Sequence, residues 1–401
     1  MRLNHRIVRG LAFVLLLSAM NCSLSSAHAQ VGYYTNWSTL TTWTLSGAPT
    51  NKYWMFIASS ADRTKLAAAS DYAGIYVSTN SGVTWTQTSA PLTAWESVAC
   101  SADGAKLAAV LNGGGIYVST NSGVTWTQTS APLAGWVSIT SSADGTKLAA
   151  AATTSSASGI YVSTNSGLTW ASTPAGDQYW GWIACSADGT KLVAAVFGGF
   201  IYASANGGGT WTLTSAPPED WVSITSSADG TKLAAAVYSG GIYTSTNSGV
   251  TWTKTSAPVE DWGPIAGSAD GTKLVAEVDG SGIYISSNSG VTWTQTSIPS
   301  DSWLRVAASA DGTKLAVAVE LGGIWTAQAT IQPILTITNS GDSVMVSWPY
   351  PCSGWTLQQN CSLCNPAGWF TCGGAASTNN GVNNLTITPP TGPLFLRLCS
   401  P

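Results

Sequence analysis

Acidic side chains precede tryptophans at three places in the chain that are 40 or 41 residues apart. The residues concerned are Glu219, Asp220 and Trp221; Glu260, Asp261 and Trp262; and Asp301 and Trp303. Indole rings stack on sugar rings, and carboxylates accept hydrogen bonds from hydroxyl groups. These residues therefore predict a carbohydrate or glycoconjugate site. The alternative interpretation is structural: the acids solvate a surface, and the repeated tryptophan fills the same internal space in each repeat.

Paired carboxylates are also what a glycoside hydrolase requires. A retaining or inverting enzyme places two carboxyl groups at a defined separation across the scissile bond. Asp220 with Asp261 or Asp301 would supply such a pair. The sequence does not give the separation, so hydrolysis stands as the alternative to a non-catalytic binding function.

Most other catalytic chemistry is excluded by composition. The two histidines, His5 and His28, both lie in a predicted export signal, so the mature chain has none. This excludes Ser-His and Cys-His nucleophiles and His-ligated metal sites. No phosphate-binding loop, Gly-x-Ser-x-Gly elbow or metal-ligand cluster is present. We therefore expect no cofactor and no metal.

The elements that must position these residues belong to a repeat. An Asp-Gly-type turn recurs at steps of 41, 41, 44, 41, 41 and 41 residues, and a tryptophan stands eight residues before each turn. The turns centre on Asp62, Asp103, Asp144, Asp188, Asp229, Asp270 and Asp311. A period near forty with four short β runs is typical of one blade of a β-propeller.

The two ends of the repeat array complete each other. Thr42-Trp43-Thr44 followed by Ala48-Pro49 matches the end of a repeat whose beginning is missing. Trp303–Ala327 is a beginning without an end. Six whole units and one composite unit predict an all-β, seven-bladed propeller that is closed by its N-terminal strand, which removes exposed sheet edges.

A second repeated turn, Ser-Thr-Asn-Ser-Gly-Val-Thr-Trp, resembles the Asp-box or BNR motif, Ser-x-Asp-x-Gly-x-Thr-Trp. That motif occurs in sialidases, sortilin-type receptors, xyloglucan-degrading propellers and photosystem II assembly factors of the Ycf48 type. The Asp is replaced in every copy, by Asn80, Asn121, Asn165, Asn206, Asn247 and Asn288. Asn can still cap the turn through backbone N–H groups. The resemblance implies the propeller fold over about residues 40–327 and a structural role for the motif.

The resemblance also sets limits on function. Sialidases hold the substrate carboxylate with three arginines, whereas the propeller region has only Arg63 and Arg305. The xyloglucanases use a cleft between two propellers, and this chain has one. Ycf48-type factors present arginine-rich surfaces, which this acidic chain lacks.

The N-terminus predicts export. Residues 1–29 combine a basic start, the apolar segment Leu11–Leu17 and the small-x-small pattern Ala27-His28-Ala29, so cleavage is expected between Ala29 and Gln30. The mature chain then has 12 basic and 19 acidic residues, a formal charge of about −7. It lacks the basic footprint of a nucleic-acid-binding protein and has no apolar segment long enough to span a membrane.

Residues 30–330 form the predicted propeller, and residues 331–401 a small β-sandwich. Its Ser-Trp-Pro, Gly-Trp-Thr-Leu-Gln and Phe-Leu-Arg-Leu segments resemble fibronectin-III-like tail modules of secreted bacterial proteins, verrucomicrobial ones especially. Five cysteines gather there: Cys352, Cys361, Cys364, Cys372 and Cys399. In an exported protein they predict two disulfides of undetermined connectivity, with zinc binding as the less favoured alternative. Cys100 and Cys185 occupy equivalent places in two non-neighbouring repeats and are expected to be free and buried.

Variation between repeats collects on the loops opposite the Asp-Gly and Asn-Ser-Gly turns, where most remaining carboxylates also fall. Variable loops on a regular scaffold commonly carry a binding site. The sequence therefore predicts an exported, monomeric, non-catalytic binding or scaffold protein, secreted, periplasmic or at the cell surface. Its expected partner is a carbohydrate or an extracellular or envelope protein.

Overall fold

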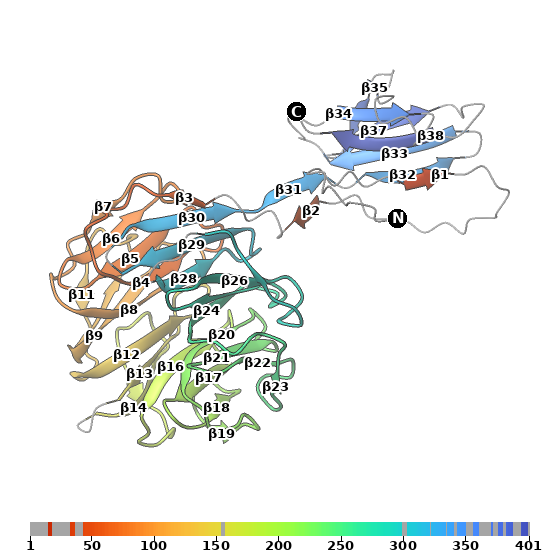
Figure 1. The fold of residues 1–401 in the computed structure, drawn as a ribbon. Coiled ribbons are helices and arrows are strands. Elements are labelled where there is room, and N and C mark those ends of the chain that lie inside the picture. Colours follow the sequence, from red (N-terminus) through yellow and green to blue (C-terminus); the bar gives the residue numbers. More distant parts are fainter. Residues whose placement is uncertain are drawn as a thin grey trace. The chain divides into compact units, whose positions relative to one another are not determined.

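The regular elements among the described residues are all short β-strands (Figure 1). The computed structural model describes residues 15–17, 33–36, 43–153, 157–298, 303–320, 322–333, 335–340, 343–349, 356–360, 370–371, 376–379, 382–387 and 394–399. Two compact units are distinguished. The larger comprises Trp37–Thr330, and the smaller comprises Met1–Asn36 with Ile331–Pro401.

The larger unit consists of four-stranded antiparallel sheets of one repeating design, in which strands consecutive in sequence pair with each other. The first three sets are β4 (Trp54–Ser59), β5 (Leu66–Ser70), β6 (Gly74–Ser78) and β7 (Thr86–Gln87); β8 (Trp95–Cys100), β9 (Leu107–Gly114), β10 (Ile116–Ser119) and β11 (Thr127–Gln128); and β12 (Ala134–Ser141), β13 (Leu148–Ala152), β14 (Gly159–Ser163) and β15 (Ala171–Ser172). The second and third sets are joined through a β9–β12 pairing.

The next three sets repeat this order. They are β16 (Trp180–Cys185), β17 (Leu192–Val196), β18 (Ile201–Ser204) and β19 (Thr212–Leu213); β20 (Trp221–Ser226), β21 (Leu233–Val237), β22 (Ile242–Ser245) and β23 (Thr253–Lys254); and β24 (Trp262–Gly267), β25 (Leu274–Val278), β26 (Gly282–Ser286) and β27 (Thr294–Gln295). Several four-stranded antiparallel sheets of this kind are consistent with a β-propeller.

The last sheet combines strands from both ends of the unit. It contains β28 (Trp303–Ala308), β29 (Lys314–Val319), β30 (Ile324–Gln328) and β3 (Trp43–Leu45). β3 pairs antiparallel with β30, with Thr44 opposite Thr326. The pairing that the sequence predicted between the two incomplete repeats is therefore present.

A closed cycle of backbone hydrogen bonds links the sheets. In each one, the alanine before the turn Asp donates its N–H to the carbonyl of the same alanine in the next sheet, at 2.7–2.8 Å. The cycle runs through Ala61, Ala102, Ala143, Ala187, Ala228, Ala269 and Ala310, and Ala310 donates back to Ala61. The first strands likewise contact one another in order, and β28 contacts β4. The larger unit is therefore a ring.

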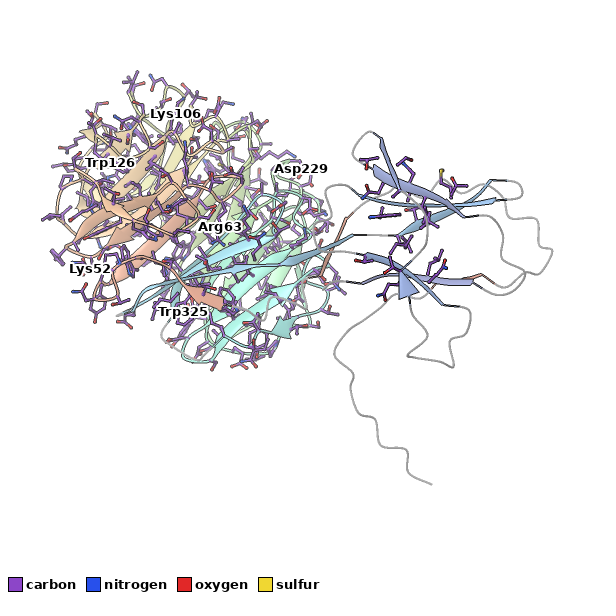
Figure 2. All side chains as sticks on the ribbon, turned by 90° about the horizontal axis from the view of Figure 1, so that it is seen from above. Lys52, Arg63, Lys106, Trp126, Asp229 and Trp325 are labelled. Atoms are coloured by element: carbon purple, nitrogen blue, oxygen red, sulfur yellow. The ribbon has the colours of Figure 1, made fainter. Side chains whose placement is uncertain are left out.

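Arg63, labelled in Figure 2, joins the first and last sheets of this ring. It stands where the other turns have Gly, with a positive φ of 57°. Its side chain is 3% exposed and donates hydrogen bonds to the carbonyl oxygens of Leu315 and Ala327, on β29 and β30. Burial lowers its pKa to about 10. Arg63 therefore stabilises the ring where the two ends of the array meet.

Small residues and one large one fill the space between sheets. The second strands are Leu- and Ala-rich and buried on both faces, as in β13 and β21, because each face packs against a neighbouring sheet. The first-strand tryptophans fill the wider part of the gap. Trp221, for example, lies edge-on to Tyr243 at 5.3 Å and tilted against Trp252 at 6.4 Å.

The two repeated turns are fixed by their own side chains. Asp229 Oδ1 accepts hydrogen bonds from Ser227 Oγ at 2.6 Å and from the Thr231 N–H at 2.9 Å. These bonds lower the pKa of Asp229 to about 2, with the Ser227 bond as the largest cause. In the second turn, Asn247 Oδ1 accepts from the Thr251 N–H at 2.9 Å. The predicted capping of the turn by Asn is present.

The described residues of the smaller unit form two four-stranded sheets and a two-stranded one. One sheet has the order β32 (Thr336–Ser340), β33 (Ser343–Pro349), β37 (Val382–Ile387) and β36 (Ser377–Asn379). The other has the order β1 (Leu15–Leu17), β38 (Leu394–Cys399), β34 (Thr356–Asn360) and β35 (Phe370–Thr371), and β2 (Tyr33–Asn36) pairs with β31 (Thr330–Pro333). β1 belongs to the segment predicted to be removed on export.

The cysteine predictions divide between the two units. Cys100 and Cys185 are free, as expected, and half-buried. Cys352, Cys361, Cys364 and Cys372 lie outside the described residues, as does the side chain of Cys399. Within the described part of the chain, no helix has the length and apolarity needed to cross a bilayer.

Candidate functional site

One backbone hydrogen bond brings two variable residues together at the edge of successive sheets. The residue before the first-strand tryptophan accepts at its carbonyl from the N–H of the residue that follows the second strand. The donor–acceptor pairs are Asp71–Tyr53, Thr153–Gly135, Phe197–Tyr179, Tyr238–Asp220 and Asp279–Asp261, at 2.9–3.1 Å. Positions 18 residues apart in the chain are therefore neighbours. The two residues of each pair determine whether the edge of that sheet is aromatic, acidic or neither.

Aromatic residues occupy this edge in two adjacent sheets. Tyr179 and Phe197 are 60% and 51% exposed, and their rings meet edge to face at 5.9 Å. Tyr238, in the next sheet, is 51% exposed. Large aromatic rings that remain this exposed are available to contact a ligand.

Carboxylates follow the aromatic residues along the same edge. Asp220 and Asp261 are exposed, and each directly precedes a buried tryptophan. Ser239 Oγ donates to Asp261 Oδ1 at 2.6 Å, which links two neighbouring sheets. Glu219 and Glu260 are half-buried, and each is held by a backbone bridge to a glycine of the preceding sheet, Gly199 or Gly240. The two sheets thus present their acids in the same way.

We call this set the aromatic–acidic arc. It comprises Tyr179, Phe197, Asp220, Tyr238, Asp261 and Asp279, from the sheets that begin with β16, β20 and β24. Ring surfaces can pack on the C–H groups of a sugar or on an aliphatic side chain, while carboxylates accept hydrogen bonds from hydroxyl or ammonium groups. The arc combines both kinds of contact on neighbouring sheets.

The structure corrects one part of the sequence prediction. Trp221 and Trp262 are 0% and 1% exposed, and their indole N–H groups donate to Gly199 O and Pro258 O, at 2.9 and 3.1 Å. Their ring faces are covered by neighbouring aromatic rings, so they are not available for stacking on a ligand. Asp301 lies outside the described residues, and Trp303 is described only as the first residue of β28.

Glu277 differs from the carboxylates of the arc, because its side chain is buried and only 2% exposed. It occupies a position of β25 at which β17 and β21 have Ala195 and Ala236. A Cβ at Gly263 would collide with Glu277 Oε2, so the Glu277 carboxyl group would have to move if this glycine were replaced. Oε2 has no hydrogen-bond partner among the described residues. Burial raises the pKa of Glu277 to about 8, against the lowering effect of Arg305, and Asp279 adds to the rise.

Three long side chains that the sequence reasoning missed meet in the interior near Glu277. The Arg305 guanidinium lies 4.9 Å from the ring of Trp182 and 5.1 Å from that of Phe56. The two rings stack at 6.4 Å with an interplanar angle of 26°. Burial lowers the pKa of Arg305 to about 10, which the carboxylates of Glu277 and Glu96 oppose.

A sequence signal for these residues existed. Phe56, Trp182 and Arg305 each stand two residues after a first-strand tryptophan. The same position holds a serine in three other repeats, where Ser97, for example, accepts a hydrogen bond from the Ile139 N–H at 3.3 Å. These three residues could have been found in the sequence because each departs from the serine that other repeats have at this interior position. Both arginines of the larger unit are therefore internal, and neither belongs to the arc.

Metal binding finds no support in the part of the chain that the structure describes. No three His, Cys, Asp or Glu side chains there are grouped so as to hold an ion.

Comparison with known proteins places the fold but not the family. No protein-family model and no curated protein matches the chain. Among solved structures, YCF48 from Cyanidioschyzon merolae is similar with a TM-score of 0.57 and 16% identity, over 72% of this chain and 98% of that one. A structure described as YCF48 bound to D1 peptide is similar with a TM-score of 0.57 and 15% identity, over 72% of this chain and 97% of that one.

The GH74 enzyme of Niastella koreensis is similar with a TM-score of 0.57 and 17% identity, over 77% of this chain. This chain spans only 59% of that enzyme's length. Together these likenesses show that the larger unit has a β-propeller fold of the YCF48 and GH74 type, with repeated blade motifs.

Proposed function

We propose that this chain is an exported, non-catalytic binding or scaffold protein that recognises a glycan or a surface protein through the aromatic–acidic arc. Its architecture would be a seven-bladed, Asp-box-type propeller followed by a fibronectin-III-like β-sandwich stabilised by disulfides. The observation that carries the proposal is the arc itself: exposed rings and exposed carboxylates on three consecutive sheets.

A glycan is the ligand that the arc favours. The rings of Tyr179, Phe197 and Tyr238 offer apolar surface that burial against sugar C–H groups would stabilise. Asp220 and Asp261 are exposed acceptors beside them. Trp221 and Trp262 act as internal packing, so stacking would fall to these tyrosine and phenylalanine rings.

A surface protein is the second ligand class. A solved propeller of similar fold is described as bound to a peptide, which shows that such a scaffold can hold one. The acids of the arc would favour a segment that contains lysine or arginine, and such binding would weaken with salt because exposed charges are screened.

The test is a screen of the mature protein, residues 30–401, on glycan and envelope-protein arrays. Phe197→Ala and Tyr238→Ala should abolish the signal, whereas Tyr72→Ala removes a ring that is 72% exposed but outside the arc and should preserve it. Loss of signal in all three variants, or in none, would count against the arc. Export is tested separately, since the secreted protein should begin at Gln30.

Glycoside hydrolysis is the second candidate function. Its specific support is that Asp220 and Asp261 occupy the same exposed position in neighbouring sheets. Release of reducing sugar from mixed polysaccharides that disappears in Asp220→Asn or Asp261→Asn would establish it. Activity that survives both substitutions would remove these residues from consideration.

A further inference from the structure

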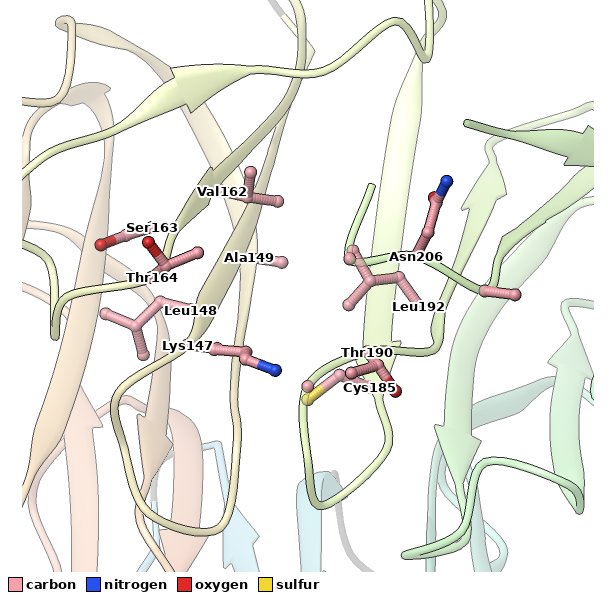
Figure 3. Close-up of a pocket in the computed structure, with 13 residues that line it drawn as sticks. Lys147, Leu148, Ala149, Val162, Ser163, Thr164, Cys185, Thr190, Leu192 and Asn206 are labelled. Carbon is pink, nitrogen blue, oxygen red and sulfur yellow. The ribbon is translucent and has the colours of Figure 1, made fainter. Parts of the chain in front are cut away.

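Cavities at equivalent positions between neighbouring sheets differ sharply in volume. In the gap between the β8–β11 and β12–β15 sets, the cavity beside Lys106 has a volume of about 10 Å³, and the one beside Lys232, between the β20–β23 and β24–β27 sets, is also about 10 Å³. The equivalent cavity beside Lys147, between the β12–β15 and β16–β19 sets, has a volume of about 320 Å³. Figure 3 shows Lys147 extending into this cavity from one side and Cys185 and Thr190 lining the other.

Lost side chains account for the difference. In the Asn-type turn of the β16–β19 set, Ala205 and Gly207 replace the Thr164 and Ser166 of the preceding set. Ser166 accepts a hydrogen bond from Lys106 Nζ at 3.3 Å, and Ser248 accepts one from Lys191 Nζ at 3.2 Å. Gly207 offers Lys147 no such hydroxyl group. The gap on the other side of the same sheet, which Ala203 and Ala205 line, is also enlarged, to about 220 Å³.

The chemistry of the large cavity selects a class of ligand. Its walls are mainly apolar, from Leu148, Ala149, Val162, Leu192 and the thiol of Cys185. Lys147 is the one charged residue among those that line it, and its Nζ donates to the carbonyl of Asp188 at 2.8 Å. The Asp188 carboxylate lies near but is satisfied by Ser186 and Thr190. A volume of this size is at the lower end of that of small-molecule sites, about 300–1,000 Å³.

We propose that this gap between the β12–β15 and β16–β19 sets is a binding site for a small apolar molecule that carries one negative charge. The apolar part lies against Leu148, Val162 and Leu192, and the anionic group pairs with the Lys147 ammonium. The site shares no residue with the aromatic–acidic arc, so this proposal can be tested independently of the proposed function.

The probe is octanoate, with octanol and octylammonium as matched molecules that lack its negative charge. Calorimetry should give one octanoate site per chain, with octanol bound about ten-fold more weakly and octylammonium more weakly still. Octanoate should also slow the alkylation of Cys185 by iodoacetamide. Cys100, in the equivalent place beside Lys65 and Ser122, is the internal control and should not respond.

The decisive variant restores the residues of the other repeats, Ala205→Thr with Gly207→Ser. Gly207 has a φ of 65°, and the serines at the same place have φ of 57–61°. A Cβ there would meet only Gly189 O, at 3.8 Å. The variant should therefore fold, refill the cavity and bind octanoate at least about ten-fold more weakly. Lys147→Gln should weaken octanoate binding but not octanol binding. Octanoate binding unchanged in the refilled variant, or octylammonium bound as tightly as octanoate, would overturn the proposal.

Discussion

Glu277 should make the stability of the larger unit depend on pH in a range where little else titrates. Its pKa is raised from 4.5 to about 8, chiefly because the carboxyl group is buried. The fold therefore prefers the protonated acid, and the unfolded chain ionises first. The free energy of unfolding should be highest below pH 4.5 and should fall as the pH rises toward 8, by ~1.4 kcal/mol per pH unit at most. The mature chain has no histidine to obscure this slope.

Glu277→Gln keeps the size of the side chain and removes the ionisation. We expect wild type and variant to have similar stability at pH 5, and the variant to be more stable at pH 8 by up to about 4 kcal/mol. Urea unfolding, followed by tryptophan fluorescence at pH 5, 6, 7 and 8, measures the difference.

Asp279→Asn is a second arm of this experiment. Asp279 is a neighbouring negative charge that contributes to the raised pKa of Glu277. Removal of this charge should lower the pKa of Glu277. Ionisation of Glu277 in the folded chain should then begin at lower pH, and less folding free energy should be lost as the pH rises. Equal pH slopes for wild type and Glu277→Gln would refute the reasoning, because the slope would then come from other groups.

Three further predictions concern the ring. Arg63→Gly relieves a positive φ but removes two buried hydrogen bonds across the closure, so the unfolding free energy should fall by about 2 kcal/mol in chemical denaturation. Trp221→Ala leaves a cavity between two sheets and should cost about 3–5 kcal/mol by the same assay. The lowered pKa values of Asp188 and Asp229, each about 2, mean that stability is full above pH ~4 and is lost as the pH falls through 2. Thermal unfolding at pH 5, 3 and 2 should show this loss, and an unchanged midpoint at pH 2 would contradict it.

Much of the scaffold was predictable because the same residues recur at equivalent positions in several repeats. The match of Trp43 to Trp85 predicted the pairing of β3 with β30, since equal spacing implies an equal place in a sheet. The identical position of the first-strand tryptophans favoured packing, and Trp221 is indeed buried. The Asn of the second turn was expected to cap it, because its amide can replace a carboxylate as an acceptor.

The rest could not be read from residue types alone. Tyr179 and Phe197 form a pair only because the register of two strands places their backbones together. Glu277 is surrounded by apolar residues in sequence, but only the packing against Gly263 shows that its carboxyl group points inward. The enlarged cavity follows from Ala205 and Gly207, which replace Thr and Ser and whose effect depends on what faces them across the gap. Each of these depends on neighbours that are distant in sequence.

The measurement that tests the central claim most directly is calorimetric titration of the mature protein with the strongest ligand from the arrays, repeated with Phe197→Ala/Tyr238→Ala and with Tyr72→Ala. The account predicts that the double variant binds at least about ten-fold more weakly while it unfolds at the same temperature, and that Tyr72→Ala binds like wild type. Wild-type affinity in the double variant would contradict the assignment of binding to the aromatic–acidic arc.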